Sequence, residues 1–372
     1  MSLTSSTLLT VVVLATVLAF AAAVWLWPRL GRRGGRPALG RIGVVLVLQV
    51  LLLSSVGLAA NRTFLLYGSW ADLAGKERPM PTMGRDADAP GGSAVRLLGR
   101  QPTQMRGGGT PHLGGEIEKI TVQGERSKAV VQAYVYLPPE YFQKGNENRK
   151  FPATVVLTGF PGMAENLLKP LPYPKTVWTL AKQKKMPPMI LVMMQPSVVP
   201  TRNTQCIDVP GGPQSETFFG TDLPKALSGA YRVGTSPSNW AVIGDSTGGY
   251  CALKVALQHP ESYAAGVGLS ADYKPEIDAD SGDLFHGNAA EEKRSDLLWS
   301  LDNLPQGKSS FLVATSLQGE GNYKATQKFI EKVKAPAHVS SITLDHGGHN
   351  FNTWKREIPP AMEWIGARIG AE

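Results

Sequence analysis

Two long apolar runs open the chain. Residues 8–27 carry no charged side chain, and in residues 42–60 the one strongly polar side chain is Gln49. An α-helix rises 1.5 Å per residue, so about 20 apolar residues cross a hydrocarbon core of roughly 30 Å. A helix in a soluble core is rarely apolar on every face over that length. The pattern therefore predicts a membrane anchor over residues 1–60, with transmembrane helices at 8–27 and 42–60.

The short loop between these runs is basic. Residues 1–41 contain five arginines and no acidic residue: Arg29, Arg32, Arg33, Arg36 and Arg41. Because arginine is retained on the cytoplasmic side, we expect this loop inside the cell and both ends of the chain outside. A cleaved signal peptide is the alternative for the first run, but residues 1–10 lack the positive charge of such a segment. The predicted location is the cell membrane, multi-pass, with the domain that follows residue 115 on the extracytoplasmic side.

The next stretch, residues 61–115, is rich in Gly, Pro, Arg and Asp and shows no apolar periodicity. That composition is typical of a solvated linker. We expect a flexible extracytoplasmic linker with one short helix near Trp70. A cell-wall-binding segment is the functional alternative.

Residues 116–372 alternate between strand and helix patterns. Strands are predicted at 117–122, 130–137, 152–157, 189–194, 241–243, 265–269, 311–315 and 339–344. Helices are predicted at 176–183, 221–231, 250–258, 323–333 and 359–369. Continuous apolar strands are typical of a parallel sheet buried on both faces. The alternation therefore predicts one α/β domain with a mostly parallel central sheet.

Charge and cysteine content narrow the function classes. The net charge is +8, but the five arginines of residues 1–41 leave only +3 for the rest. No base-stacking aromatic pattern accompanies them, so we expect no nucleic-acid partner. Two cysteines are too few for a disulfide scaffold or a four-cysteine zinc site, and we expect no cofactor and no metal. A disulfide between Cys206 and Cys251 is conceivable in an oxidising compartment, but the sequence leaves it open.

The segment from Gly244 to Gly248 reads G-x-S-x-G. The string alone is common by chance, but here a predicted buried strand precedes it and a helix follows. A strand–turn–helix of this kind raises the serine hydroxyl to the top of the sheet, beside the positive end of the helix. We therefore expect Ser246 to be a catalytic nucleophile. A glycine-rich turn with an incidental serine is the alternative.

A serine nucleophile needs a base. His349 follows the last predicted strand and precedes the last helix, where the base of an α/β-hydrolase lies. His346 is the nearest competitor, and His259 is expected to have a structural role at the end of its helix. The base must also be oriented by a carboxylate between nucleophile and histidine in the chain. Glu320, after strand 311–315, fits best, with Asp272 second and Asp302 third.

Acyl transfer further needs two backbone N–H groups for the oxyanion. One is expected from Thr247, the residue after the nucleophile. The other is expected from the loop after strand 152–157. Because Pro161 has no N–H, Phe160 is the candidate there.

The chain resembles the esterase family that includes mycobacterial mycolyltransferases and S-formylglutathione hydrolases. The resemblance runs through residues 130–139 and 157–160, the segment from Ser246 with Tyr250 and His259-Pro260, and Gly347-Gly348-His349 with Trp354 behind it. It implies an α/β-hydrolase fold, Ser246 as nucleophile, His349 as base and an acyl-enzyme. In the mycolyltransferases the acid is a Glu ahead of the final His, which agrees with Glu320, and Phe160 corresponds to an oxyanion donor.

Two function classes remain. The first is a membrane-anchored serine esterase or acyltransferase that acts on a lipid, glycolipid or cell-envelope ester, with water or a sugar hydroxyl as acceptor. The second is a non-catalytic α/β-hydrolase domain that binds the envelope or serves adhesion. The triad is the same for hydrolysis and transfer, so the sequence separates neither these two reactions nor the acyl chains they use. The oligomeric state is also left open.

Overall fold

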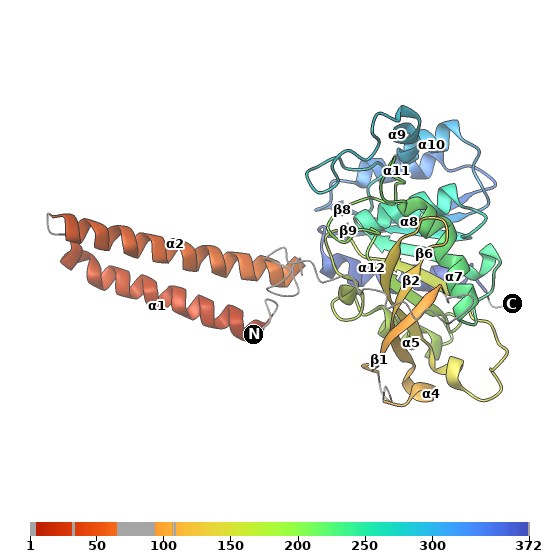
Figure 1. Cartoon of the computed structure of the whole chain (residues 1–372), viewed down its shortest axis with the longest axis horizontal. Helices are drawn as coiled ribbons and strands as arrows, with labels where there is room; N and C mark the ends of the chain where they lie inside the picture. The colour runs from red at the N-terminus through yellow and green to blue at the C-terminus, as the bar shows by residue number, and fades with distance from the viewer. Residues whose placement is uncertain (1–4, 32–33, 65–93, 106, 108, 371–372) are drawn as a thin grey trace. The chain divides into compact units, whose positions relative to one another are not determined.

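The computed structural model describes residues 5–31, 34–64, 94–105, 107 and 109–370. The chain divides into two units, Met1–Ala87 and Asp88–Glu372 (Figure 1). The short helix expected near Trp70 lies outside the described residues. Each unit is described by itself below.

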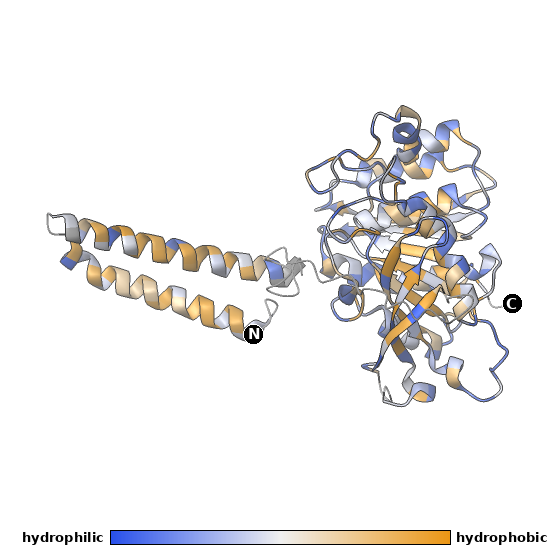
Figure 2. Ribbon diagram, viewed as in Figure 1, coloured by the Kyte–Doolittle hydropathy of each residue, from blue (hydrophilic) through white to orange (hydrophobic). Residues whose placement is uncertain are grey.

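The first unit is a helical hairpin of α1 (Ser6–Leu30) and α2 (Gly35–Phe64). The predicted segments 8–27 and 42–60 lie within these helices. Ser6–Leu30 and Pro37–Asn61 are long and apolar enough to cross a membrane, and their surfaces are apolar along most of their length (Figure 2). Between the helices, Thr16 Oγ1 lies 2.9 Å from Ser55 Oγ. Paired hydroxyls of this kind stabilise contacts between helices in an apolar medium.

The second unit is built on one nine-stranded sheet in the order β1-β2-β3-β5-β4-β6-β7-β8-β9. Its first three strands run antiparallel, and β5, β4, β6, β7, β8 and β9 are parallel to one another. The bounds are β1 Val95–Pro102, β2 Glu116–Gln123, β3 Val130–Leu137, β4 Ala153–Leu157, β5 Ile190–Met194, β6 Trp240–Asp245, β7 Ala265–Leu269, β8 Ser310–Gln318 and β9 His338–His346. The predicted α/β fold with a mostly parallel sheet is confirmed.

Helices cover both faces of this sheet (Figure 1). One face packs against α7, α8, α10 and α11, and the other against α5 and α12. The α-helices of the unit are α4 Pro111–Gly114, α5 Tyr173–Lys182, α6 Ser215–Thr217, α7 Leu223–Ala230, α8 Thr247–Gln258, α9 Ala289–Ser295, α10 Leu297–Asn303, α11 Tyr323–Lys332 and α12 Phe351–Gly366. Short helical turns are η1 Pro139–Phe142, η2 Ala164–Leu167, η3 Phe218–Asp222 and η4 Pro237–Asn239. The central strands β4 to β7 are buried along their whole length, which explains their continuous apolar runs.

The folded unit begins inside the segment 61–115, which was predicted to be a linker along its whole length. Val95–Pro102 forms β1, an edge strand that pairs antiparallel with β2, and Pro111–Gly114 forms α4. Most β1 side chains are exposed and the register shifts between Leu97 and Gly99. The strand therefore lacks the apolar alternation that would identify it locally, because its order comes from long-range pairing.

The last helix also begins earlier than the predicted residue 359. Asn350 caps α12, since its side chain accepts hydrogen bonds from the N–H groups of Asn352 and Thr353. Helix α12 contains Pro359 and Pro360, which were expected to mark its start. His349 consequently stands next to the helix cap instead of in a long loop.

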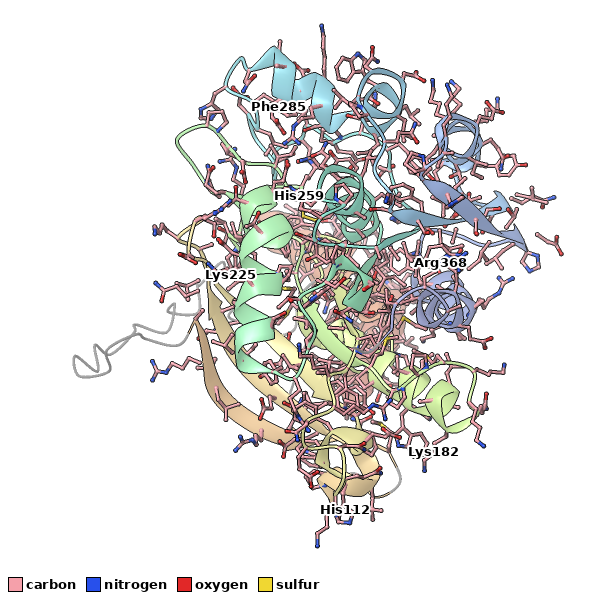
Figure 3. All side chains as sticks on the ribbon, turned by 90° about the vertical axis from the view of Figure 1, so that its right-hand side faces the viewer. His112, Lys182, Lys225, His259, Phe285 and Arg368 are labelled. Carbon is pink, nitrogen blue, oxygen red and sulfur yellow. A yellow bond between two sulfur atoms is a disulfide. The ribbon has the colours of Figure 1, made fainter. Side chains whose placement is uncertain are left out.

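Two buried features stabilise the region around α8. A disulfide joins Cys206 to Cys251, whose Cα atoms are 5.4 Å apart. Beside it Lys254, which is fully buried, pairs with Glu216 and donates a 3.0 Å hydrogen bond to the carbonyl of Cys206. His259, which is labelled in Figure 3, lies next to this cluster, because its Nε2 atom is 3.1 Å from Glu216 Oε1. Its structural role matches the sequence expectation.

A small separate core packs the loop after β5 against the segment that follows β7. Its buried members are Ile207, Val209, Leu284 and Phe285. Phe285 and His112 lie at opposite ends of the second unit in Figure 3. The end of the unit that contains Phe285 therefore has a packed core of its own beyond the central sheet.

Candidate active site

Ser246 stands in a sharp turn between β6 and α8. Its φ of 55° is one that non-glycine residues rarely adopt. A Cβ on Gly248 would lie 2.4 Å from the carbonyl oxygen of Leu157, and one on Gly244 would lie 2.3 Å from the backbone of Gly248. Only glycine fits at these two positions, so the G-x-S-x-G spacing is a packing requirement of the turn. Strain of this kind at one half-buried polar side chain is typical of a functional site.

His349 faces this serine. Its Nε2 atom lies 2.8 Å from Ser246 Oγ, although the two residues are 103 positions apart in the chain. The imidazole ring also packs edge-on against Trp354 at a centroid distance of 5.3 Å. The geometry allows the neutral ring to accept the proton of the serine hydroxyl.

Glu320 lies on the loop after β8, beside the histidine loop. The N–H of Gly347 donates to the carbonyl of Gln318 at 3.0 Å, which joins the two loops. The carboxylate of Glu320 accepts hydrogen bonds from the hydroxyl of Ser270 and from the N–H of Ser316 at 3.1 Å. The negative charge of Glu320 raises the pKa of His349.

Desolvation dominates the pKa values of both groups. Partial desolvation of the ring lowers the pKa of His349 below its usual value, while the carboxylates of Glu320 and Glu276 oppose this. Burial raises the pKa of Glu320, and its hydrogen bond from Ser270 and the charge of His349 oppose this. The lowered pKa keeps the histidine neutral, as a general base requires.

The competing residues lie in other environments. Asp302 pairs with Lys332 on the outside of the domain. Burial, aided by Glu276, raises the pKa of Asp272 to about 6, but its charge is not among those acting on His349. His346 is exposed, and its carbonyl accepts a 2.8 Å hydrogen bond from Arg356.

The backbone segments of the two expected oxyanion donors lie next to the serine. Thr247 is the first residue of α8, so its N–H has no partner within the helix. The loop of Gly159 and Phe160 packs directly against the nucleophile, because a Cβ on Gly159 would lie 3.0 Å from Ser246 Cβ. Both backbone segments are thus adjacent to the serine side chain.

Comparison with known proteins agrees with this geometry. The family model Esterase, described as "Putative esterase", matches residues 125–365. The chain belongs to this esterase family. An uncharacterised protein of Corynebacterium glutamicum is 24% identical to this chain over 252 residues, or 64% of this chain. The match spans 58% of that relative's length.

Solved structures share the fold of this esterase. An S-formylglutathione hydrolase from Agrobacterium tumefaciens superposes with a TM-score of 0.58 at 16% identity, covering 74% of this chain and all of the other. A fluorophosphonate-binding serine hydrolase of Staphylococcus aureus gives 0.54 at 15% identity, covering 67% and 97%. A ferulic acid esterase gives 0.57 at 18% identity, covering 68% and 98%. The predicted α/β-hydrolase fold and family resemblance are confirmed.

Three residues near this site, Ser270, Glu276 and Asp245, were not among the candidates from the sequence, and Trp354 entered there only through the family resemblance. Ser270 bonds to Glu320, and Trp354 donates a 2.9 Å hydrogen bond to that same serine. Glu276 lies on the loop after β7, and its charge raises the pKa of His349. Asp245 is buried directly before the nucleophile. Of these, only Asp245 lies inside the G-x-S-x-G motif. A carboxylate at the end of an otherwise apolar strand is unusual, and this could have identified Asp245 from the sequence.

Proposed function

We propose that this chain is a serine esterase or acyltransferase in which Ser246 is the nucleophile, His349 the base and Glu320 the orienting acid. The observation that carries the proposal is the 2.8 Å distance between His349 Nε2 and the hydroxyl of a serine held at φ 55°. An incidental serine in a glycine-rich turn has no need of a histidine brought from 103 residues away.

The proposed reaction has two halves. Ser246 Oγ attacks the ester carbonyl while His349 takes its proton, and the resulting oxyanion is stabilised by the N–H groups of Phe160 and Thr247. Collapse of the intermediate breaks the bond to the alcohol, which leaves with the proton from His349. A water molecule or a second hydroxyl then gives its proton to His349 and attacks the acyl-enzyme, which releases acid or a new ester and regenerates Ser246.

Glu320 supports the proposal through charge. Its carboxylate raises the pKa of His349 against desolvation, so it stabilises the imidazolium that forms when the ring takes the serine proton. The start of α8 adds positive potential where negative charge develops, since α8 is a helix of 12 residues beginning at Thr247.

We further propose that the substrate is an acyl lipid, glycolipid or cell-envelope ester. Two helices long and apolar enough to span a membrane precede the esterase domain in the chain. The basic loop between them favours a cytoplasmic loop and an extracytoplasmic domain. The buried disulfide of Cys206 and Cys251 supports an oxidising compartment. A domain held at that surface would meet membrane and envelope esters, with a sugar hydroxyl as an alternative to water.

The test is covalent labelling of the full-length chain in detergent with a fluorophosphonate, read by intact mass and peptide mapping. Ser246→Ala and His349→Ala serve as comparisons. We expect one adduct on Ser246 and none in either variant. No adduct on wild-type protein that melts cooperatively would contradict the proposal and favour a non-catalytic binding domain.

A further inference from the structure

Asp245 lies between the nucleophile and the oxyanion loop. Its side chain is 1% exposed, and its Oδ2 accepts a hydrogen bond of 2.9 Å from the N–H of Gly159. Gly159 immediately precedes Phe160, the proposed oxyanion donor. One buried carboxyl thus connects the backbone next to Ser246 with the backbone next to that donor.

Hydrogen bonds hold the two peptides that flank the Cα of Gly159, one before it and one after it. The Gly159 carbonyl accepts a 2.8 Å hydrogen bond from the N–H of Gly162, while the Gly159 N–H is bound by Asp245. In a trans peptide the C=O and the following N–H point in opposite directions. The direction of the Gly159 carbonyl therefore fixes that of the Phe160 N–H.

Glycine alone would not keep this orientation. A Cβ at position 159 would lie 3.0 Å from Ser246 Cβ and 3.2 Å from Asp245 Oδ2, so the close approach excludes a side chain. A glycine in a loop has wide backbone freedom, and the peptides before and after it can rotate unless each of them is bound. The Asp245 carboxyl supplies the second of those bonds.

The buried carboxyl carries a cost. Its Oδ1 atom has no hydrogen-bond partner within the described residues. Burial raises the pKa of Asp245 to about 7, against the hydrogen bond from Gly159. An apolar side chain would avoid that cost in a strand that is buried throughout, so a carboxyl here calls for an explanation beyond packing.

We propose that Asp245 is a positioning residue that aims the Phe160 N–H at the oxyanion through its hydrogen bond with Gly159. The inference rests on the proposed esterase function. It predicts that Asp245 contributes to the transition state and little to the binding of the ground-state ester.

A matched control exists in the same core. Glu357 on α12 is fully buried, and both of its carboxyl oxygens lack a partner within the described part of the chain. Burial, aided by the charges of Glu320 and Asp245, raises the pKa of Glu357 to about 8. Like Asp245, Glu357 is a buried carboxyl with oxygen atoms that lack a hydrogen-bond partner within the described residues. It differs from Asp245 because Asp245 accepts the hydrogen bond from Gly159.

The test compares Asp245→Leu, Asp245→Asn and Glu357→Gln in the full-length chain, with a p-nitrophenyl ester as substrate. Removal of one oxyanion donor costs about 100- to 1,000-fold in kcat, so misdirecting it in Asp245→Leu should cost about 10- to 100-fold. KM should stay within about 3-fold. Asp245→Asn, which keeps an acceptor oxygen, should recover most of the loss. Glu357→Gln should match wild type.

A boronic acid that forms a tetrahedral adduct with the serine hydroxyl gives a second measurement. Its affinity should fall in Asp245→Leu by the same factor as kcat/KM. Wild-type kcat/KM and boronate affinity in Asp245→Leu would overturn the inference while leaving the esterase function standing. An inactive, unlabelled wild type would overturn both. If Asp245→Leu does not melt cooperatively, Asp245→Ala is judged by the same criteria.

Discussion

The indole N–H of Trp354 donates a 2.9 Å hydrogen bond to Ser270 Oγ, and that hydroxyl donates in turn to Glu320. The three residues come from α12, from the end of β7 and from the loop after β8. Trp354 also packs edge-on against His349. One side chain of the last helix thus contacts the ring of the proposed base and, through Ser270, supports the proposed acid.

Ser270→Ala tests this connection. The change removes the hydroxyl between Trp354 and Glu320 and leaves the buried indole N–H without its acceptor. We expect the free energy of unfolding to fall by about 1–3 kcal/mol, measured by urea denaturation. We also expect kcat/KM to fall several-fold, because Glu320 loses a hydrogen bond that orients it. Unchanged kcat/KM would show that the acid is oriented without Ser270.

Glu320→Gln and Asp272→Asn together identify the acid. Loss of the orienting carboxylate should lower kcat by about 100-fold or more, because the imidazolium is no longer stabilised. Asp272→Asn should stay within about 3-fold, since its charge is not among those acting on His349. Steady-state ester hydrolysis by the two variants checks this. The reverse pattern would assign the role to Asp272.

The pH dependence follows from the lowered pKa of His349. The base must be neutral, so kcat/KM should rise with pH through that pKa. Because desolvation lowers the pKa of His349, the midpoint of this rise in kcat/KM should lie below the usual histidine value of about 6.5. Glu320 raises this pKa, so in Glu320→Gln the midpoint should move to still lower pH. An acid limb centred above pH 7 in wild type would contradict the prediction.

Lys254→Met should destabilise the domain by about 3 kcal/mol, because it leaves the buried Glu216 with fewer cations. Burial raises the pKa of Glu216, but Lys254, His259 and Arg294 outweigh burial and hold it well below its usual range. The stabilisation from Glu216 is therefore present above about pH 4.5 and lost as pH falls below that value. Urea midpoints at neutral and acid pH measure both effects.

Lys332→Met is the matched control for that variant. Lys332 pairs with Asp302 on the outside of the domain, where solvent screens the charges. Its loss should change the free energy of unfolding by less than about 1 kcal/mol. Equal losses in the two lysine variants would argue that burial of the Glu216 cluster is without consequence.

The membrane proposal is tested by extraction and by protease access. We expect the full chain to remain in the membrane fraction after alkaline carbonate extraction, since two helices of 25 residues each exceed the length that spans a bilayer. Protease added outside intact spheroplasts should digest the esterase domain. Protection of the domain until lysis would reverse the proposed orientation, and release by carbonate would contradict anchoring.

Features with a local cause could be predicted from the amino-acid sequence. Long apolar runs identify α1 and α2, buried strands produce continuous apolar segments, and the glycines around Ser246 are required by a turn that excludes any Cβ. Each of these signals is local because its cause is local: helix length, burial on both faces, or backbone sterics. The fold class and the candidate nucleophile could therefore be predicted without the structure.

Tertiary structure decided which distant groups meet. The pairing of β1 with β2, the hydrogen bond between Ser270 and Glu320, and that between Asp245 and Gly159 join residues from 14 to 86 positions apart. The local sequence around a loop carboxylate does not reveal whether the side chain faces solvent or a histidine. Only the packing of the sheet and α12 places Glu320 where its charge acts on His349, because electrostatic and hydrogen-bond interactions depend on separation in space and leave no periodic trace in the chain.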